Sequence, residues 1–330
     1  MKVLIGLPKD RLHADISEWE RLAEIEYVTA SDENALRKQI VDADVLIPGY
    51  SITLTDDILT EGKKLKLIQV FSVGFERVDA DAAAKRGIMV CNTGGSNAES
   101  VAELAWALIL GVARQIPGGD RLMRAGKWER FQPQSHRMVW GKTLGVIGFG
   151  AIGLRVGKIG RLAFNMELLA ADPFITPETA EALGGRLVSL DELMQMSDVI
   201  SVHVPLSPAT THLIGERELR LMKPTAILVN TARGAVIDEA SLTLCLQEGV
   251  LAGAGLDVFE VEPLAADSPL RRMENVVLVP HIGTCPEAGL RMREVGVENV
   301  ARFLRGEKPM RIVNPTYIIA RLSKTEKEDN

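Results

Sequence analysis

The chain has 330 residues, of which 46% are hydrophobic and 25% are charged, and this length is enough for about two domains of ordinary size. Such a composition is typical of a globular protein with a large apolar core. The net charge is −6 and no basic block occurs along the chain, so nucleic acids and anionic membranes are not expected partners.

The cysteines and the amino-terminal segment indicate the compartment. Three cysteines, Cys91, Cys245 and Cys285, are scattered without the spacing of a metal site or a redox pair, which favours reduced thiols in a cytoplasmic protein and no bound metal. The apolar run within Met1–Pro8 is too short for a signal peptide and indicates a first strand. The longest apolar helix, Val101–Ala113, is too short to span a membrane.

Short runs rich in valine, isoleucine and leucine alternate with helical stretches, which is typical of parallel sheets covered on both faces. The first set of predicted strands is Val3–Leu7, Ile25–Tyr27, Val45–Pro48, Leu67–Phe71 and Ile88–Val90. The second set is Leu144–Ile147, Glu167–Ala171, Val199–Val202, Ile227–Asn230, Gly253–Leu256 and Val276–Leu278. An apolar helix, Glu99–Arg114, and an irregular stretch, Ile116–Gly141, lie between the two sets.

The two sets of strands predict two domains. A glycine-rich motif opens the second set, so the first 98 residues are expected to form a separate domain. The chain after Glu287 is helical over Leu290–Arg305 and can pack back on that first domain. We therefore expect one discontinuous domain, residues 1–98 with 288–330, and a second domain, residues 99–287.

The second set begins with a strand, a glycine turn, a helix and another strand. The strand Leu144–Ile147 leads into Gly148-Phe149-Gly150-Ala151-Ile152-Gly153, and Asp172 ends the next strand, 19 residues after Gly153. In this setting the first glycine permits the tight turn, the second admits the pyrophosphate and the third lets helix and strand pack closely. The helix N-terminus offers free N–H groups to phosphate. An ordinary glycine-rich turn is the alternative, but the complete arrangement predicts a dinucleotide site.

Asp172 indicates which dinucleotide is bound. Its carboxylate would accept hydrogen bonds from a ribose 2′-OH and repel a 2′-phosphate. Pro173 and Phe174 follow it, and neither can neutralise such a phosphate. The predicted cofactor is therefore NAD(H) rather than NADP(H).

Three polar turns follow strands of the second set and carry Arg233, Glu262 and His281. Ligands of an open α/β sheet bind beyond the carboxyl ends of its strands, so these three side chains can converge on one substrate. Taken singly, each has another explanation: a surface cation, a solvated acid and a turn histidine with satisfied hydrogen bonds. Their common placement beside a dinucleotide turn favours a catalytic site.

From about Phe71 to Asn314, the chain resembles the D-isomer-specific 2-hydroxyacid dehydrogenase family, in its phosphoglycerate and glyoxylate–hydroxypyruvate branch. The motifs that carry this resemblance are Gly145–Gly153, His203–Leu206, Asn230–Gly234, Asp257–Pro263 and Pro280–Gly283, together with the crossing segment Asn92–Asn97. The resemblance implies an α/β fold of two Rossmann-like domains, each a parallel sheet with helices on both faces, with the active site in the cleft between them.

The resemblance assigns catalytic roles to Arg233, Glu262 and His281. Arg233 would hold the substrate and stabilise negative charge on its oxygen, His281 would exchange a proton with that oxygen, and Glu262 would orient the imidazole. In relatives, backbone N–H groups matching Ser72, Val73 and Gly74 bind the substrate carboxylate. Cofactor contacts are implied for Gly148, Gly150, Ala151, Ile152, Gly153, Asp172, Val204, Pro205, Thr231, Ala232, Asp257 and Gly283.

The chain departs from the family pattern at two positions. Ala151 stands where many relatives have arginine, so one contact to the pyrophosphate is expected to be missing and cofactor binding to be weaker. Cys285 lies four residues after His281, where relatives often have a small residue. Hydride transfer needs no enzyme nucleophile, so we expect no Cys–His catalytic pair. His203, at a strand end, is expected to be structural.

The expected function is therefore NAD-dependent interconversion of a 2-keto acid and a D-2-hydroxy acid, with glyoxylate, hydroxypyruvate and 3-phosphoglycerate as candidate substrates. The alternative is an NADH-sensing corepressor-like binding protein of the same fold. Relatives form homodimers through the region matching Glu99–Gly141, and core packing is the alternative use of its apolar residues. Those residues are Trp106, Leu108, Ile109, Leu122, Met123, Trp128, Phe131 and Trp140.

Overall fold

The computed structural model describes residues 1–8, 12–29, 32–49, 51–128 and 136–314. The chain divides into two compact units, of which unit 1 is Met1–Asn97 with Pro286–Asn330 and unit 2 is Ala98–Cys285. Phe131 and the residues after Asn314 lie outside the described residues. Each unit is described by itself.

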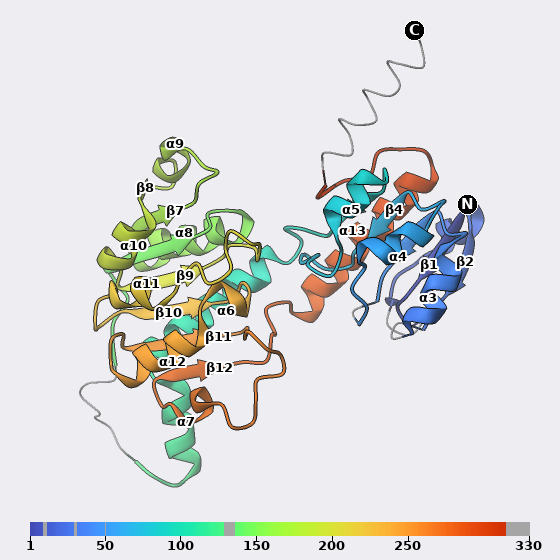
Figure 1. The fold of residues 1–330 in the computed structure, drawn as a ribbon. Helices are drawn as coiled ribbons and strands as arrows, with labels where there is room; N and C mark the ends of the chain where they lie inside the picture. The colour runs from blue at the N-terminus through green and yellow to red at the C-terminus, as the bar shows by residue number, and fades with distance from the viewer. Residues whose placement is uncertain (9–11, 30–31, 50, 129–135, 315–330) are drawn as a thin grey trace. The chain divides into compact units, whose positions relative to one another are not determined.

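Unit 1 contains a five-stranded parallel sheet in the order β2-β1-β3-β4-β5 (Figure 1). Each predicted strand of the first set is present, with ends that differ from the prediction by at most two residues. The observed strands are β1 (Lys2–Ile5), β2 (Glu24–Tyr27), β3 (Val45–Ile47), β4 (Leu67–Gln69) and β5 (Met89–Cys91). Most of their residues are buried, as expected for a sheet covered on both faces.

Helices cover both faces of this sheet. One face packs against α3 (Glu33–Ile40), α4 (Asp56–Glu61) and α5 (Ala80–Lys85), through Leu36, Ile58 and Ala83 among other residues. The opposite face packs against α2 (Ser17–Leu22) and α13 (Pro286–Leu304). The segment around α13 comes from the far end of the sequence, so unit 1 is built from both ends of the chain.

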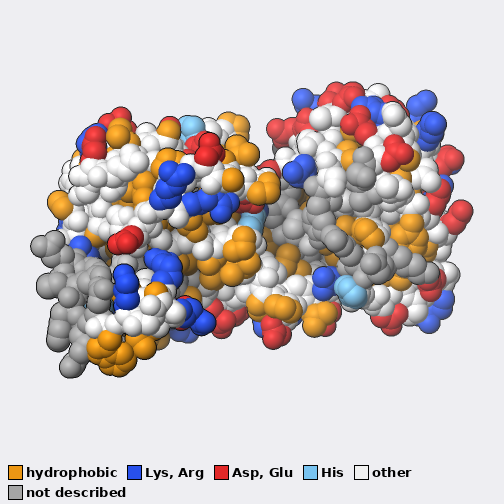
Figure 2. Space-filling view, turned by 90° about the horizontal axis from the view of Figure 1, so that it is seen from below, with side chains coloured by type: hydrophobic (Ala, Val, Ile, Leu, Met, Phe, Trp, Pro, Cys, Tyr) orange, Lys and Arg blue, Asp and Glu red, His pale blue; other side chains and the backbone are white. Residues whose placement is uncertain are grey.

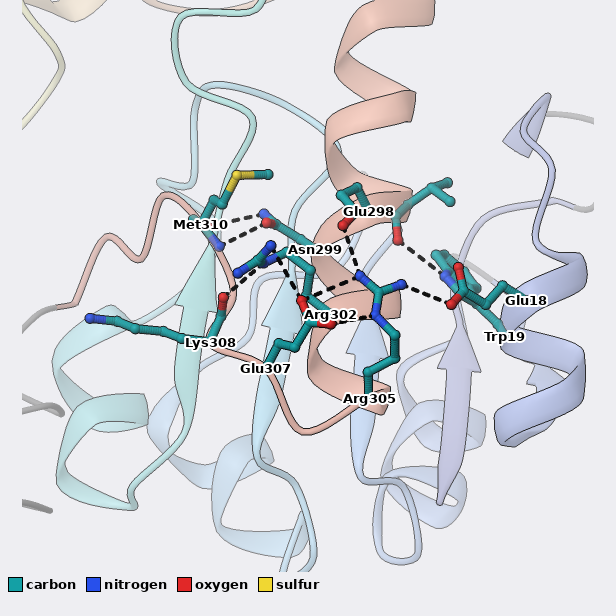
Figure 3. A network of polar contacts seen from close by, with 10 residues as sticks. Glu18, Trp19, Glu298, Asn299, Arg302, Arg305, Glu307, Lys308 and Met310 are labelled. Carbon is teal, nitrogen blue, oxygen red and sulfur yellow. Dashed lines mark hydrogen bonds and ion pairs between the residues drawn. The ribbon is translucent and has the colours of Figure 1, made fainter.

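A network of polar contacts joins α13 to the rest of unit 1 (Figure 3). The indole of Trp19 donates to the carbonyl of Val297 at 3.1 Å, and the buried amide of Asn299 donates to Gln69 at 2.9 Å. Arg305 lies at 2.8 Å from Glu18 and is also paired with acids of its own segment. Exposed ion pairs contribute little, so the buried hydrogen bonds and the apolar contact stabilise this attachment most.

Unit 2 contains a seven-stranded parallel sheet in the order β12-β11-β10-β9-β6-β7-β8. Its strands are β6 (Thr143–Ile147), β7 (Glu167–Ala171), β8 (Gly185–Leu187), β9 (Val199–Val202), β10 (Ile227–Asn230), β11 (Gly253–Leu256) and β12 (Val276–Leu278). All predicted strands of the second set are present. The prediction missed β8, because this strand has only three residues, which are partly exposed and include Arg186. The strand order reverses between β6 and β9, which is where doubly wound sheets bind ligands.

Helices also cover both faces of the unit 2 sheet (Figure 1). The apolar α6 (Ala98–Ala113) and α8 (Ala151–Phe164) cover one face, with the rings of Trp106 and Phe164 stacked at 4.5 Å. Gly255 lets α6 lie close to the sheet, because a Cβ at this position would be only 2.9 Å from the Cβ of Leu108. The other face carries α10 (Leu190–Met196), α11 (Glu216–Arg220) and α12 (Glu239–Gln247), while α9 (Pro177–Glu181), η1 (Gly234–Val236) and η2 (Pro269–Arg272) lie in connections.

The predicted irregular stretch after α6 is partly wrong, because residues Ile116–Arg124 form the helix α7. Pro117 in its first turn and basic residues in its last turn fit a helix, but two adjacent glycines hid the pattern. No residue of α7 is buried. Figure 2 shows hydrophobic and basic side chains side by side on the face of unit 2 from which α7 projects in Figure 1.

Part of the predicted dimer surface is wrong, because some of its residues are buried in the core. Trp106, Leu108 and Ile109 are at most 5% exposed because α6 packs against strands of its own unit, so these three residues belong to the core. The exposed large hydrophobic residues of this region are Ile116, Met123, Trp128, Met138 and Trp140. No helix among the described residues is long and apolar enough to cross a lipid bilayer.

Candidate active site

The glycine loop, Gly148–Gly153, joins β6 to α8 at the point where the strand order reverses. Gly148 has φ 87°, and a Cβ there would lie 2.8 Å from the backbone of His203 and Val204. A Cβ on Gly153 would overlap the carbonyl oxygen of Gly148, so helix and strand approach too closely for any side chain. Around Gly150, by contrast, a Cβ would meet nothing within 4 Å. The loop therefore leaves open space above its second glycine.

The start of α8 faces this space with its backbone donors. Ala151 and Ile152 form the first turn, and no side chain caps the helix at Gly150. The first N–H groups of a helix lack intrahelical partners, so they can bind a phosphate group. Ala151 contributes no side-chain donor of its own.

Asp172 lies beside the glycine loop at the end of β7. Its Oδ2 accepts a hydrogen bond from the N–H of Phe149 at 2.8 Å, and its Oδ1 accepts one from the N–H of Phe174 at 2.8 Å. The carboxylate is thus fixed next to the loop, where a ribose hydroxyl could reach its remaining lone pairs. Phe174 is 93% exposed.

Two buried polar atoms without a hydrogen-bond partner lie at the ends of β9 and β10. They are Nδ1 of His203 and Oγ1 of Thr231, and a buried polar group without a partner costs about 1–3 kcal/mol. Nε2 of His203 lies 2.8 Å from Oγ of Ser201, and burial lowers the pKa of this imidazole to about 3. His203 is therefore neutral at physiological pH and unsuited to exchange protons with a substrate.

The residues present fit a dinucleotide. The open space at Gly150, the uncapped helix, the carboxylate of Asp172 and the unsatisfied Thr231 hydroxyl all lie at the carboxyl edge of one sheet. Val204 and Pro205 follow β9, and Ala232 follows β10 at the same edge. These residues would hold the pyrophosphate, the ribose and the nicotinamide of the cofactor.

His281 and Glu262 form a close pair at the same edge of the sheet. Nδ1 of His281 lies 2.7 Å from Oε2 of Glu262, whose Oε1 accepts from the N–H of Phe259 at 3.1 Å. Both side chains are partly exposed. Since Nδ1 is committed to the carboxylate, Nε2 is the ring nitrogen that can exchange a proton with a bound substrate.

The backbone around His281 is held in an unusual conformation by Asp257. His281 has φ 55°, a left-handed conformation that few residues other than glycine adopt. Asp257 is 1% exposed, and its two carboxylate oxygens accept from the N–H groups of Ile282 at 2.6 Å and Gly283 at 3.0 Å. Burial raises the pKa of this carboxyl. Asp257 therefore shapes the turn that presents His281, in addition to any contact with a cofactor.

Ser100 also supports this turn and was missed in the sequence. Its hydroxyl donates to the carbonyl of Gly283 at 2.7 Å and accepts from the N–H of Cys285 at 2.8 Å. The available signal was a serine in a largely apolar helix, which gives no indication of its distant partners.

Arg233 lies three residues after the end of β10, has an extended backbone and immediately precedes η1. Asn230 shapes this turn: its side chain donates to the carbonyl of Arg233 at 2.9 Å and accepts from the N–H of Ala232 at 2.9 Å. A Cβ on Gly234 would overlap the carbonyl group of Phe259, so the turn of Arg233 packs directly on the turn that leads to Glu262. The structure thus brings together the turns of Arg233, Glu262 and His281.

The predicted substrate residues Ser72, Val73 and Gly74 lie in unit 1, on the turn after β4. The hydroxyl of Ser72 donates to the carbonyl of Gly74 at 2.6 Å, and the amide of Asn92 donates to the carbonyl of Val73 at 2.7 Å. These bonds use the carbonyl oxygens of the turn and not its N–H groups, which are the groups expected to bind the substrate carboxylate.

Comparisons with known proteins agree with this geometry. Residues 106–283 match the family described as D-isomer specific 2-hydroxyacid dehydrogenase, NAD binding domain. The chain is 39% identical over 314 residues to a glyoxylate reductase of Aeropyrum pernix, covering 93% of this chain and 92% of the relative. It is 40% identical over 317 residues to a D-3-phosphoglycerate dehydrogenase of Methanocaldococcus jannaschii, covering 95% of this chain and 59% of the relative.

A solved structure gives the same relationship. D-lactate dehydrogenase from Aquifex aeolicus, complexed with NAD and lactic acid, superposes with a TM-score of 0.81 at 34% identity, covering 93% of this chain and 96% of that one. The matched family covers more than half of the chain and includes the glycine loop, Arg233, Glu262 and His281. The chain therefore belongs to the D-isomer specific 2-hydroxyacid dehydrogenase family, whose enzymes interconvert 2-keto acids and D-2-hydroxy acids with NAD.

Proposed function

We propose that His281 is the acid and base of this reaction and that Glu262 orients it. The observation that carries this proposal is the 2.7 Å contact between Nδ1 of His281 and Oε2 of Glu262. In reduction, Nε2 would donate a proton to the carbonyl oxygen; in oxidation, it would take the proton back. The nicotinamide supplies or accepts the hydride. General acid–base catalysis of this kind contributes about 10²–10⁴-fold.

Arg233 is proposed to bind the substrate beside His281. Its guanidinium would stabilise the negative charge that develops on the carbonyl oxygen, an effect worth about 10²–10³-fold. A planar guanidinium also fits a carboxylate better than lysine does. The contact between the turns of Arg233 and Glu262, at Gly234, supports a joint role.

We propose that unit 1 serves as the substrate-binding domain and unit 2 as the NAD-binding domain. The backbone N–H groups of Ser72, Val73 and Gly74 would bind the substrate carboxylate. The match of the NAD-binding family to residues 106–283 supports the second assignment. The carboxylate of Asp172 beside the glycine loop supports a preference for NAD(H) over NADP(H).

The proposed substrates are glyoxylate, hydroxypyruvate and 3-phosphoglycerate. The similarity to a glyoxylate reductase supports the small keto acids, and the similarity to a D-3-phosphoglycerate dehydrogenase supports the phosphorylated one. We also propose a homodimer that uses the exposed hydrophobic residues of α7 and the segment after it, and a cytoplasmic location, which the three free thiols support.

A substrate panel tests this proposal. Turnover of glyoxylate, hydroxypyruvate, pyruvate, 2-ketoisocaproate and 3-phosphohydroxypyruvate is followed by NADH absorbance, with NADPH as a second cofactor. We expect turnover of at least one candidate with NADH and slower turnover with NADPH. Tight NADH binding without turnover of any keto acid would contradict the catalytic proposal and favour an NADH sensor.

A further inference from the structure

His212 lies in unit 2 on the connection between β9 and α11, away from the proposed reacting groups. Its Nε2 lies 2.8 Å from Oε1 of Glu260, and its Nδ1 lies 3.6 Å from Oδ2 of Asp238. Like His281, it has a left-handed backbone, with φ 50°. Its N–H donates to the carbonyl of Ala235 in η1 at 2.8 Å, so the residue is fixed by its backbone as well as by its ring.

Glu260, the partner of His212, also joins the turn after β11 to the start of α12. Its Oε1 accepts from the N–H of Glu239 at 3.0 Å, and its own N–H donates to Oε2 of Glu239 at 3.0 Å. A carboxylate at a helix N-terminus satisfies a free backbone donor and interacts favourably with the helix dipole. We call the contacts among His212, Glu260 and Glu239 the latch.

The latch holds the same turn that presents Glu262. The N–H of Phe259, one residue before Glu260, donates to Oε1 of Glu262, and the carbonyl group of Phe259 lies against Gly234 with no room for a side chain. A displacement of Glu260 would therefore move the donor that orients Glu262 and also the surface on which the turn of Arg233 rests. A solvent-exposed polar contact contributes little to overall stability, so the effect of the latch should appear in alignment rather than in stability.

We propose that His212 is a positioning residue of the reaction, which acts through Glu260 to align Glu262 with His281. This inference rests on the acid–base role of His281 proposed above. His212 contacts neither of the reacting groups itself. Loss of its contact with Glu260 lets the turn of Glu262 relax, so proton transfer from His281 becomes slower while the dinucleotide site remains formed.

Two substitutions at His212 test whether the contact with Glu260, and not the imidazole as such, is what matters. In His212→Asn the shorter amide no longer reaches Glu260, and asparagine tolerates the left-handed backbone. In His212→Gln an amide N–H can occupy the place of Nε2. We expect His212→Asn to lower kcat per NADH-binding site roughly tenfold, with KM for NADH within about twofold of wild type, and His212→Gln to restore most of the loss.

The solvent deuterium isotope effect on kcat gives the second measurement. It should rise in His212→Asn, because proton transfer then limits turnover more strongly, whereas a reduced fraction of folded enzyme would leave it unchanged. His13→Asn is the matched control, since His13 in unit 1 is also exposed and has φ 40°. It should behave as wild type.

Two outcomes overturn the proposal: unchanged kcat in His212→Asn, or an equal loss in His212→Asn and His212→Gln. Glu260→Ala provides an independent check, because it removes the carboxylate from both of its partners and should reproduce the effects of His212→Asn. His281→Asn in the same assay tests the acid–base role of His281 separately from the role of the latch. If it retains turnover, the acid–base proposal is wrong; if it loses turnover while His212→Asn does not, only the latch is wrong.

Discussion

The carboxylate of Asp172 accepts a hydrogen bond from the backbone N–H of Phe149, with 2.8 Å between Oδ2 and the nitrogen. This bond joins the end of β7 to the middle of the glycine loop. The sequence predicts Asp172 as the acid that binds a ribose hydroxyl, and the structure adds that the same carboxylate helps to hold the glycine loop. A substitution of Asp172 therefore changes two properties, which variants can separate.

Asp172→Asn keeps a side-chain oxygen for the loop but removes the negative charge. We expect NADH to bind about tenfold more weakly, because a hydrogen bond to a charged group is worth about 1.5–3 kcal/mol, and the preference for NADH over NADPH to fall by at least as much. Asp172→Ala should weaken both cofactors further, since the N–H of Phe149 loses its partner. Titration of cofactor fluorescence measures both affinities. If the ratio of the NADH affinity to the NADPH affinity in both variants equals that of the wild type, Asp172 does not bind the ribose.

Alanine substitutions at Gly150 and Gly153 separate cofactor binding from stability at the proposed pyrophosphate site. A methyl group on Gly150 meets open space, so Gly150→Ala should keep the thermal stability of the wild type while binding NADH at least about tenfold more weakly. Gly153→Ala should lower Tm by several degrees, because its Cβ would overlap the carbonyl oxygen of Gly148. Thermal unfolding without cofactor and NADH titration give the two readouts. Unchanged NADH binding in Gly150→Ala would mean that the open space is not used by the cofactor.

The backbone of His281 determines the best substitution for its proposed role. Because its φ is 55°, asparagine fits the turn better than alanine, and His281→Asn should keep the fold while lacking the acid and base. We expect turnover of the best keto acid to fall by at least about 10²-fold with NADH affinity nearly unchanged. Steady-state rates and cofactor titration on the same preparation check this. Turnover within a few-fold of wild type would refute the acid–base role.

The elements that depend on local sequence were predictable. The buried strands are continuous runs of valine, isoleucine and leucine, and the glycine loop has a fixed spacing in a strand–turn–helix context, so both could be located from the sequence. The helix α7 and the strand β8 could not, because two adjacent glycines interrupt the short sequence of α7 and β8 has three residues with little apolar character.

Contacts between residues far apart in the sequence were not predictable in the same way. The bonds from Ser100 to the turn after His281, and from His212 to Glu260, join positions whose sequence neighbours give no sign of each other. The double use of Asp257 is similar: its motif implies a cofactor contact, but only the fold shows that its carboxylate also holds Ile282 and Gly283. Motifs identify groups with chemical roles more readily than the residues that align them.

The exposed hydrophobic residues around α7 give a prediction about assembly. Met123 and Trp140 are 54% and 59% exposed, and exposed apolar side chains of this kind favour contact with a second copy. The double variant Met123→Glu with Trp140→Glu should be monomeric at micromolar concentration, whereas the wild type should be a dimer. Leu162→Glu is the control, since Leu162 on α8 is 77% exposed and lies outside this segment. Light scattering that gives a monomer for the wild type would remove the dimer proposal.

His203 gives a prediction about stability in acid. Burial lowers the pKa of its imidazole from 6.5 to about 3, so between these values the unfolded chain binds a proton that the folded chain does not. The contribution of the neutral, buried ring is fully present above about pH 6.5 and is lost as the pH falls towards 3, at up to about 1.4 kcal/mol of unfolding free energy per pH unit. In His203→Gln, which can keep a contact with Ser201, that part of the slope should be missing. Urea unfolding of both proteins at several pH values between about 7 and 4 measures the two slopes, and parallel slopes would show that His203 is protonated as readily in the folded chain as in the unfolded one.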